Sequence, residues 1–200
     1  MSKIQLLIAT TNPGKTNEIK EFLRDEYLAV YNLSDFKHLS GIEVEETGTS
    51  LFENAEIKAR TFGRLSGILT LSDDTGLFVE ALDGNPGISS KRYGSSDQQR
   101  IDRLLDEMKH VPATKRNAYF MSSIVLFDPA SEKTTEFVGR IDGQIALKPE
   151  GENGFGYDPV FYVPNLNKTF AMMKAEEKNQ VSHRGQALQK LKKFIRKRVR

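Results

Sequence analysis

Apolar and polar positions change period along the chain, which predicts alternating strands and helices. Residues 3–10 form a short apolar run, and after a polar turn Ile19 and Phe22 recur at the spacing of one helix face. Asn12 is a residue type that caps helices, and Pro13 suits the first helical position because its missing N–H costs little there. The N-terminal segment therefore predicts a strand, a loop and a helix.

A second helix is predicted to begin near residue 50. Ser50 and Glu53 have the spacing of a capping box, and Ala55, Ala59 and Phe62 lie on one face of the helix that follows. That face is expected to point toward the core.

A buried strand is predicted over residues 67–72, and it is expected to end at two carboxylates, Asp73 and Asp74. The segment 84–87, Gly-Asn-Pro-Gly, is typical of a loop. A third helix is predicted to open at Ser96, again with a glutamine or glutamate three residues on. Its apolar stripe consists of Ile101, Leu104, Leu105 and Met108.

The second half of the chain begins with the strongest strand candidate, residues 118–127. Asp128 and Pro129 end it, and residues 134–141 are expected to pair back as the other arm of a hairpin. Residues 149–158 are rich in turn formers, and residues 182–196 close the series with a helix. Alternating helices and strands favour an α/β fold with a mixed sheet, of one domain over residues 1–200 or two lobes whose loops meet in a cleft.

Composition narrows the class of protein. The 200 residues are 38% apolar and 28% charged, and no apolar run approaches the ~20 residues of a membrane-spanning helix. The absence of cysteine excludes disulfides, thiolate nucleophiles and cysteine-bound zinc. The N-terminus lacks the features of a secretory signal, so a cytoplasmic location is expected.

Charge is concentrated at the C-terminus. The chain has 29 basic and 27 acidic residues, but residues 190–200 hold seven basic residues and no acidic one, which leaves 22 against 27 elsewhere. Such a run is typical of a nucleic-acid-binding arm or of the solvated face of a helix. Leu188, Leu191, Phe194 and Ile195 recur there at helical spacing, which favours the helix face.

The loop of residues 10–15, Thr-Thr-Asn-Pro-Gly-Lys, is a candidate phosphate site. A helix N-terminus offers unpaired N–H groups and partial positive charge, and Lys15 adds a full charge. The loop is not a P-loop, because Ala9 stands where that motif requires its first glycine. By itself, the pattern is equally typical of an ordinary capped helix.

A set of carboxylates is the candidate metal site. It comprises Glu43, Glu45, Glu46, Asp73 and Asp74. Mg²⁺ takes oxygen ligands and usually only one or two protein carboxylates, with substrate phosphates and water completing its shell. Adjacent residues of a strand point to opposite faces, so one of the two aspartates is expected to face the site. Solvated acidic loops are the alternative interpretation.

Two further segments are candidates for binding a flat ligand. In the Gly-Phe-Gly-Tyr-Asp-Pro run of residues 154–159, glycines flank an aromatic ring that could stack on a base, and Asp158 offers an acceptor at its edge. A Gly-rich turn over the core is the structural alternative. Lys178 and Arg184 precede or begin the last helix and could bind phosphate or a base carbonyl. His183 has no second histidine at metal-ligand spacing.

Taken together, these segments resemble the inosine triphosphate pyrophosphatase family along essentially the whole chain. The shared motifs are residues 8–15, 45–48, 52–60, 72–77, 86–87, 154–159 and 176–185. The resemblance implies a two-lobed α/β fold around a long, twisted mixed sheet, a homodimer, Mg²⁺ as cofactor, and a nucleotide in the cleft between the lobes. It implies hydrolysis of ITP, dITP or XTP to the monophosphate and pyrophosphate. Neither a nucleic acid nor a membrane is expected as a partner.

The resemblance also implies roles for individual residues. Asp74 would be the general base and would hold Mg²⁺ together with Glu45. The substrate-binding residues would be Thr10, Thr11, Asn12, Pro13, Gly14, Lys15, Asn54, Lys58, Thr75, Phe155, Gly156, Tyr157, Asp158, Lys178, His183 and Arg184.

Three functional classes stay open at this point. The first is a pyrophosphatase for these or other modified nucleotides, with water activated by Asp74 attacking the α-phosphorus. The second is a nucleotide-binding regulator without turnover. The third is a nucleic-acid-binding protein that uses the basic C-terminal run.

Overall fold

The computed structural model describes residues 3–24 and 27–199. Met1, Ser2 and Arg200, which entered the sequence-based arguments about the two ends of the chain, lie outside the described residues. The helices are α1 (Pro13–Phe22), α2 (Leu51–Ser66), α3 (Asp97–Glu107), α4 (Ala175–Val181) and α5 (His183–Val199). The strands are β1 (Ile4–Ile8), β2 (Leu28–Asn32), β3 (Leu69–Val79), β4 (Pro86–Gly87), β5 (Asn117–Asp128), β6 (Lys133–Ile145), β7 (Phe161–Val163) and β8 (Lys168–Thr169). Short 3₁₀ helices lie at Leu33–Asp35, Glu80–Leu82, Ser90–Tyr93, Ala113–Lys115, Pro164–Leu166 and Phe170–Met172.

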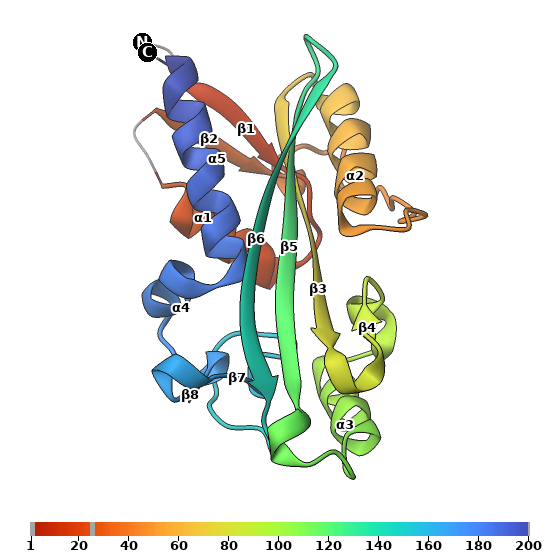
Figure 1. The fold of residues 1–200 in the computed structure, drawn as a ribbon. Helices are drawn as coiled ribbons and strands as arrows, with labels where there is room; N and C mark the ends of the chain where they lie inside the picture. Colours follow the sequence, from red (N-terminus) through yellow and green to blue (C-terminus); the bar gives the residue numbers. More distant parts are fainter. Residues whose placement is uncertain (1–2, 25–26, 200) are drawn as a thin grey trace. The chain divides into compact units, whose positions relative to one another are not determined.

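The strands form one mixed sheet, which confirms the predicted fold class. Its strand order is β2-β1-β3-β5-β6-β7-β8, and β4 pairs with β3 (Figure 1). Strand β1 runs parallel to both β2 and β3, whereas β4 is antiparallel to β3 and β7 is antiparallel to β6 and β8. The parallel part is the one whose strands are connected through helices, as parallel pairing requires.

The chain divides into two compact units. Unit 1 contains residues 1–74, 122–138 and 186–200, and unit 2 contains residues 75–121 and 139–185. Strands β3, β5 and β6 contribute residues to both units.

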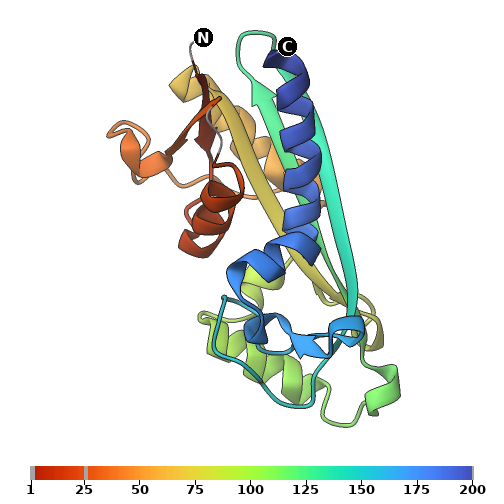
Figure 2. The ribbon, with the colours of Figure 1, turned by 90° about the vertical axis from the view of Figure 1, so that its left-hand side faces the viewer.

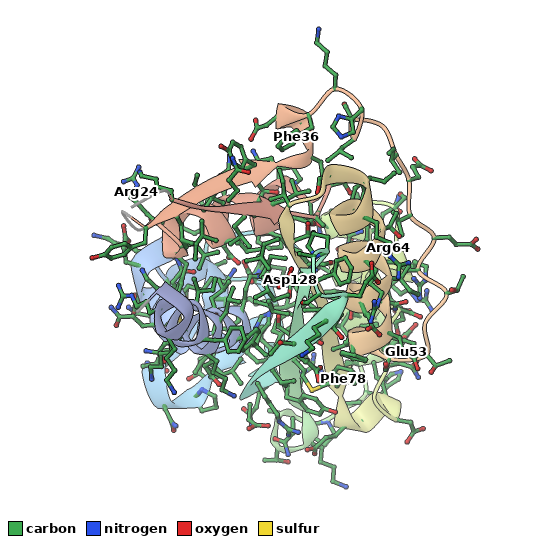
Figure 3. The ribbon with its side chains drawn as sticks, turned by 90° about the horizontal axis from the view of Figure 1, so that it is seen from above. Arg24, Phe36, Glu53, Arg64, Phe78 and Asp128 are labelled. Atoms are coloured by element: carbon green, nitrogen blue, oxygen red, sulfur yellow. The ribbon has the colours of Figure 1, made fainter. Side chains whose placement is uncertain are left out.

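Unit 1 is a sheet with helices on both faces. On one face, Ile19 of α1 and Leu188 and Leu191 of α5 share a buried cluster with Leu71 of β3 and Ile124 of β5. On the other face, α2 packs Ala55 and Ala59 against Val125 and Phe127 of β5. Figure 3 shows α5 and α2 on opposite sides of these strands, with Glu53 and Arg64 on α2. A residue of β3 therefore faces α1 and α5 or faces α2, according to its position in the strand.

Unit 2 has one large core. Leu77 and Val79 of β3, Phe120 of β5 and Ile101 and Leu104 of α3 belong to it. Tyr157, Phe161 and Phe170, from the second half of the chain, fill the same core. The predicted α3 stripe is confirmed, because Ile101, Leu104 and Met108 are all buried.

Local signals at the helix starts are confirmed. The Asn12 side chain caps α1 by accepting a hydrogen bond from the Lys15 N–H at 3.0 Å, and Pro13 is the first helical residue. Ser50 and Ser96 cap α2 and α3 in the same way, each at 3.2 Å from the N–H three residues on. The hairpin is also confirmed, since β5 and β6 are neighbours joined by residues 129–132.

The prediction that a strand ends at Asp73 and Asp74 is wrong. Strand β3 continues through both aspartates to Val79, so the carboxylates lie in the middle of an 11-residue strand. Two adjacent charges interrupt the apolar pattern, but each finds donors on its own face of the sheet. Because these donors compensate the two buried charges, the strand continues through both aspartates.

The basic run forms one face of a helix, as the apolar spacing predicted. Leu191 and Ile195 are buried, whereas Lys190, Lys193, Arg196 and Lys197 are exposed. Figure 2 shows α5 running beside β5 and β6, where Lys190 also donates to the Val138 carbonyl at 2.7 Å. Among the helices of the described residues, none has both the length and the apolar character needed to cross a membrane.

Candidate active site

The loop of residues 10–15 is folded against the start of α1. The Asn12 N–H donates to Thr10 Oγ1 at 3.2 Å, and Thr16 Oγ1 donates to the Asn12 carbonyl at 3.0 Å. With Pro13 at the first helical position and Lys15 in the first turn, the helix N-terminus presents partial positive charge beside an ammonium group. Thr11 and Pro13 are exposed. The loop therefore has the geometry of an anion site, although its contact with phosphate stays a prediction.

Two lysines from different helices converge on one backbone oxygen in unit 1. Lys15 Nζ lies 3.2 Å and Lys58 Nζ 3.4 Å from the carbonyl oxygen of Asp73. Their side chains are only 15% and 12% exposed. Two ammonium groups held at one partly buried point, each paired with carboxylates, are in place to contact the oxygens of an anion.

Asp73 and Asp74 have different surroundings because they face opposite sides of β3. Asp73 accepts hydrogen bonds from Ser122 Oγ and from Lys15 Nζ, the latter at 3.0 Å. Asp74 Oδ1 lies 3.4 Å from Lys58 Nζ, while its buried Oδ2 has no hydrogen-bond partner among the described residues. Asp74 is thus the aspartate with a carboxylate oxygen available for a water or an ion.

Burial and charge shift the ionisation of this cluster. Burial raises the pKa of Asp74 above its ordinary value, and the nearby charges of Glu46 and Asp73 raise it further, against the opposing effect of Lys58 and Lys15. Burial by itself would lower the pKa of Lys58, but the negative charges of Asp74 and Glu46 outweigh it and raise that pKa. Asp74 is therefore a stronger base than an exposed aspartate, beside a lysine that stays charged.

The acidic segment before α2 contributes Glu46 rather than Glu45 to the cluster. Glu46 Oε1 lies 2.7 Å from Lys58 Nζ, whereas Glu45 is exposed. Asn54 is fully buried, and its Oδ1 accepts a hydrogen bond from the Gly48 N–H at 2.8 Å, which fixes the end of the segment. Metal binding by Glu45 and phosphate binding by Asn54 stay predictions.

The cluster in unit 1 fits a hard divalent cation. In the described part of the chain, no group of three or more histidines and carboxylates forms a metal site. Mg²⁺ does not need one, since it takes one or two carboxylates and leaves its remaining positions to water and phosphate oxygens. The buried carboxylate of Asp74, which is not saturated with hydrogen bonds, is a suitable oxygen ligand.

Unit 2 holds the Gly-Phe-Gly-Tyr-Asp segment in a tight turn. Gly154 and Gly156 have φ of +80° and +64°, a region that side chains rarely adopt. A Cβ on Gly154 would lie 2.0 Å from Asp158 Oδ2, so only glycine fits there. Asp158 Oδ2 accepts hydrogen bonds from the Phe155 N–H at 2.8 Å and from Lys178 Nζ at 2.6 Å.

Cations surround the ring of Phe155. Lys178 Nζ lies 4.9 Å and the Arg184 guanidinium 5.6 Å from its centroid. Arg184 Nη2 also donates to Thr75 Oγ1 at 3.1 Å. The structure therefore brings Thr75, Phe155, Asp158, Lys178 and Arg184 together within unit 2. Because both cations lie over the ring and are held by other groups, the ring and the two charges form one fixed cluster.

His183 and Tyr157 are also buried in unit 2. The His183 ring stacks on Phe120 with centroids 4.6 Å apart, and the residue is 3% exposed. Tyr157 Oη donates to the Ser90 carbonyl at 2.9 Å, and burial raises the pKa of this phenol. Tyr157 thus anchors the turn through its side chain, while contact of His183 with a base stays a prediction.

Ser122 and Asp97 take part in these clusters without a predicted role, and Glu46 was predicted only as one of five carboxylates of the candidate metal site. Ser122 lies inside a long strand, and Glu46 is one of several neighbouring acids. Asp97 accepts a hydrogen bond from the Gly156 N–H and looks in the sequence like an ordinary first-turn residue of α3. Only the three-dimensional arrangement distinguishes them, since no spacing along the chain does.

A mixed α/β fold that gathers two lysines, a helix N-terminus and a buried aspartate with an unused oxygen has the features of a phosphate-handling enzyme. The chain belongs to the Ham1 family, whose model matches residues 6–194.

Two similar curated relatives carry the same enzyme name. The chain is 44% identical over 201 residues to the dITP/XTP pyrophosphatase of Thermoanaerobacter pseudethanolicus, covering 98% of each chain. It is 42% identical over 195 residues to the dITP/XTP pyrophosphatase of Bacillus cereus, covering 96% of this chain and 94% of the relative.

Solved structures of the family have the same fold. The HAM1 protein of Coxiella burnetii superimposes with a TM-score of 0.86 at 37% identity, over 97% of this chain and 99% of that one. The Ham1 protein of Staphylococcus aureus gives a TM-score of 0.84 at 38% identity with the same coverage. The predicted family and architecture are confirmed.

Proposed function

We propose that the chain hydrolyses the non-standard purine nucleoside triphosphates ITP, dITP and XTP to the nucleoside monophosphate and pyrophosphate. The observation that carries the proposal is the convergence of Lys15 and Lys58 on the Asp73 carbonyl, next to the under-bonded carboxylate of Asp74. The names of the relatives support the choice of substrate.

The triphosphate binds in unit 1 through charge and backbone donors. Lys15 and Lys58 neutralise phosphate oxygens, and the start of α1 supplies N–H groups beside Thr10, Thr11 and Gly14. In transfer at phosphorus, the protein mainly positions the reactants and stabilises charge. The lysines suit that role because their counter-ions hold them in place before substrate arrives.

Asp74 activates water. Its Oδ2 accepts a proton from the water, and the water oxygen bonds to the α-phosphorus while the bond from the α-phosphorus to the bridging oxygen breaks. Pyrophosphate leaves with the electrons of that bond. The raised pKa of Asp74 makes it a better proton acceptor than a surface carboxylate, and no covalent intermediate with the protein is required.

Mg²⁺ is the proposed cofactor, with Asp74 as the protein ligand that the geometry supports best and Glu45 as the second. Once bound, it would polarise phosphate oxygens and offset their negative charge. Glu46 keeps Lys58 oriented.

The purine base binds in unit 2. Phe155 stacks on the base, and Arg184 and Lys178 present donors to the oxygen at C6, which hypoxanthine and xanthine carry and adenine lacks. Thr75 and Asp158 hold these two cations by hydrogen bonds, and His183 completes the surroundings. A donor left facing the adenine amino group would be unpaired, at a cost of ~1 to 3 kcal/mol.

Pyrophosphate release tests the proposal directly. Wild-type protein is incubated with ITP, dITP, XTP, ATP or GTP, with and without Mg²⁺, and pyrophosphate and monophosphate are quantified together. We expect equal amounts of both products from ITP, dITP or XTP, only with the metal, and at least about tenfold lower kcat/KM for ATP. Nucleotide binding without product would indicate a non-catalytic protein, and release of single phosphates would exclude attack at the α-phosphorus.

A homodimer is the proposed assembly, because the resemblance implies one. Light scattering after size-exclusion chromatography should give about twice the 22.6 kDa of the chain. A mass of one chain over the micromolar range would contradict it. The cytoplasmic location stays a prediction.

A further inference from the structure

Asp97 connects helix α3 to the turn that carries Phe155. Its Oδ2 accepts a hydrogen bond from the Gly156 N–H at 2.7 Å. Both residues belong to unit 2, but they are far apart in the sequence, and Asp97 lies in none of the motifs that identify the family.

The two peptide groups that flank Phe155 are each held by a carboxylate. Asp158 accepts from the Phe155 N–H at 2.8 Å, and Asp97 accepts from the Gly156 N–H on the other side. Gly156 has a φ of +64°, and a glycine at this point leaves the backbone free to rotate unless something else fixes it. Asp97 supplies that restraint, so the plane of the Phe155 ring depends on both carboxylates.

Asp97 is itself held in place by a second partner. Its Oδ1 pairs with the Arg100 guanidinium, whose Nη1 donates to the carbonyls of Gly94 at 2.9 Å and Lys91 at 3.2 Å. One carboxylate oxygen therefore anchors Asp97 to the segment before α3, and the other anchors the turn. Both oxygens of the Asp97 carboxylate therefore have hydrogen-bond partners, which fixes the position of the side chain.

We propose that Asp97 is a positioning residue that sets the orientation of Phe155 and thereby contributes to affinity and selectivity for the purine base. The inference rests on the proposed function, in which Phe155 stacks on the base. Asp74, Lys15 and Lys58 belong to unit 1, whereas Asp97 belongs to unit 2, so its loss should change binding of the base and leave the turnover step intact.

A helix-stabilising role is the competing explanation. An acidic residue in the first turn of α3 interacts favourably with the helix dipole and with Arg100. That role requires the negative charge, whereas the proposed role requires only an acceptor oxygen for the Gly156 N–H. Asp97→Asn separates the two, because asparagine keeps one acceptor oxygen, which can serve the Gly156 N–H, and loses both the charge and the pairing with Arg100.

The experiment compares wild type with Asp97→Ala, Asp97→Asn and the control Asp102→Ala. Asp102 is an exposed acid on the same helix, and it accepts a hydrogen bond from Gln98 within that helix. Steady-state kinetics with ITP and ATP are measured in Mg²⁺, and hydrogen exchange of the Gly156 amide is followed by NMR in the full chain.

For Asp97→Ala we expect KM for ITP to rise about threefold to tenfold with kcat within about twofold, the effect of losing one hydrogen bond. The preference for ITP over ATP should fall by about threefold or more, and the Gly156 amide should exchange at least about tenfold faster. Asp97→Asn loses the pairing with Arg100 but keeps an acceptor for the Gly156 N–H, so its KM, selectivity and protection should lie between those of wild type and Asp97→Ala, at least about twofold nearer to wild type than Asp97→Ala. Asp102→Ala should match wild type throughout.

Wild-type KM and selectivity in Asp97→Ala, with wild type active on ITP, would overturn this inference and leave the proposed function standing. Equal losses in Asp97→Asn and Asp97→Ala would also overturn it, in favour of the helix-stabilising role. An inactive wild type would overturn the proposed function, and the role of Asp97 in base recognition with it.

Discussion

At the scale of single residues, the site in unit 1 depends on how each carboxylate is partnered. Asp73 is fully engaged by Ser122 and Lys15, whereas Asp74 keeps one buried oxygen without a partner in the described structure. The same burial that makes Asp74 a good base makes its negative charge unfavourable for folding. Function and stability are therefore opposed at this position.

Replacing Asp74 by asparagine tests that opposition. Asp74→Asn should lower kcat by about 10² to 10⁴, the usual contribution of a general base.

Because the folded-state pKa is raised, the stability contribution of Asp74 is fully present below its unfolded pKa and lost as pH rises through the folded pKa. The variant should therefore melt at a higher temperature than wild type at pH 8, by about 2–4 °C for each kcal/mol gained, with the difference vanishing near pH 4. A lower Tm at pH 8 would contradict this account.

Glu46 and Glu45 are expected to behave differently. Glu46 raises the pKa of Asp74, so Glu46→Gln should move the acid limb of the kcat/KM profile to lower pH. Glu45→Gln should leave that limb in place and raise the Mg²⁺ concentration for half-maximal rate by about tenfold or more, if Glu45 is a metal ligand. For both variants, kcat/KM is measured against pH at saturating Mg²⁺ and against Mg²⁺ concentration at fixed pH. If Glu46→Gln raised the Mg²⁺ requirement and Glu45→Gln shifted the pH profile, Glu46 would be the metal ligand.

At the scale of elements, the helix starts were predictable because capping is a local interaction. Asn12, Ser50 and Ser96 each cap the helix that the sequence assigned to them. The end of β3 was not predictable, since the partners that neutralise Asp73 and Asp74 come from α1, α2 and β5. A pattern along one strand contains no information about donors on neighbouring elements.

Helix α2 approaches β5 so closely that one position of the helix tolerates no side chain. A Cβ on Gly63 would lie 2.4 Å from Cδ1 of Phe127. Gly63→Ala should lower the free energy of unfolding by about 1–3 kcal/mol through overpacking, although alanine favours helix by about 1 kcal/mol. Leu65→Ala, at a half-exposed position of the same helix, should change it by about 0.5 kcal/mol or less. Denaturant unfolding of both variants measures the difference, and equal stabilities would refute the tight contact.

At the scale of the whole molecule, the family and the mixed α/β class could be predicted because ordered motifs extend over nearly the entire chain. The sequence did not show how the candidate residues are distributed between the two units: the phosphate-binding candidates lie in unit 1 and the base-binding candidates in unit 2. Asp97, Glu46 and Ser122 show why, since each acts through a contact between distant segments. The basic C-terminal run was interpreted correctly as a helix face because its apolar residues are buried in unit 1.

Removing the end of the basic helix should not affect the proposed activity. Deletion of residues 196–200 removes four basic residues and leaves the buried Ile195 in place. We expect kcat/KM for ITP to stay within about twofold of wild type, since the exposed charges of Arg196 and Lys197 are screened by solvent and salt. A chain ending at residue 190 is the control: it loses Leu191 and Ile195 and should melt at a lower temperature. A large fall in activity of the shorter deletion at unchanged Tm would give the basic face a role in catalysis.

The adjacent aspartates also make catalysis depend on how β3 is aligned with β1. Leu69, Thr70 and Leu71 pair with Leu6, Leu7 and Ile8 in a fixed register. A slip by one residue would turn every side chain to the opposite face, bringing Asp73 toward α2 and Asp74 toward α1. Substitutions that weaken this pairing would therefore abolish the enzyme activity while most of the secondary structure is retained. Loss of activity would then be the first measurable sign that the strands are misaligned.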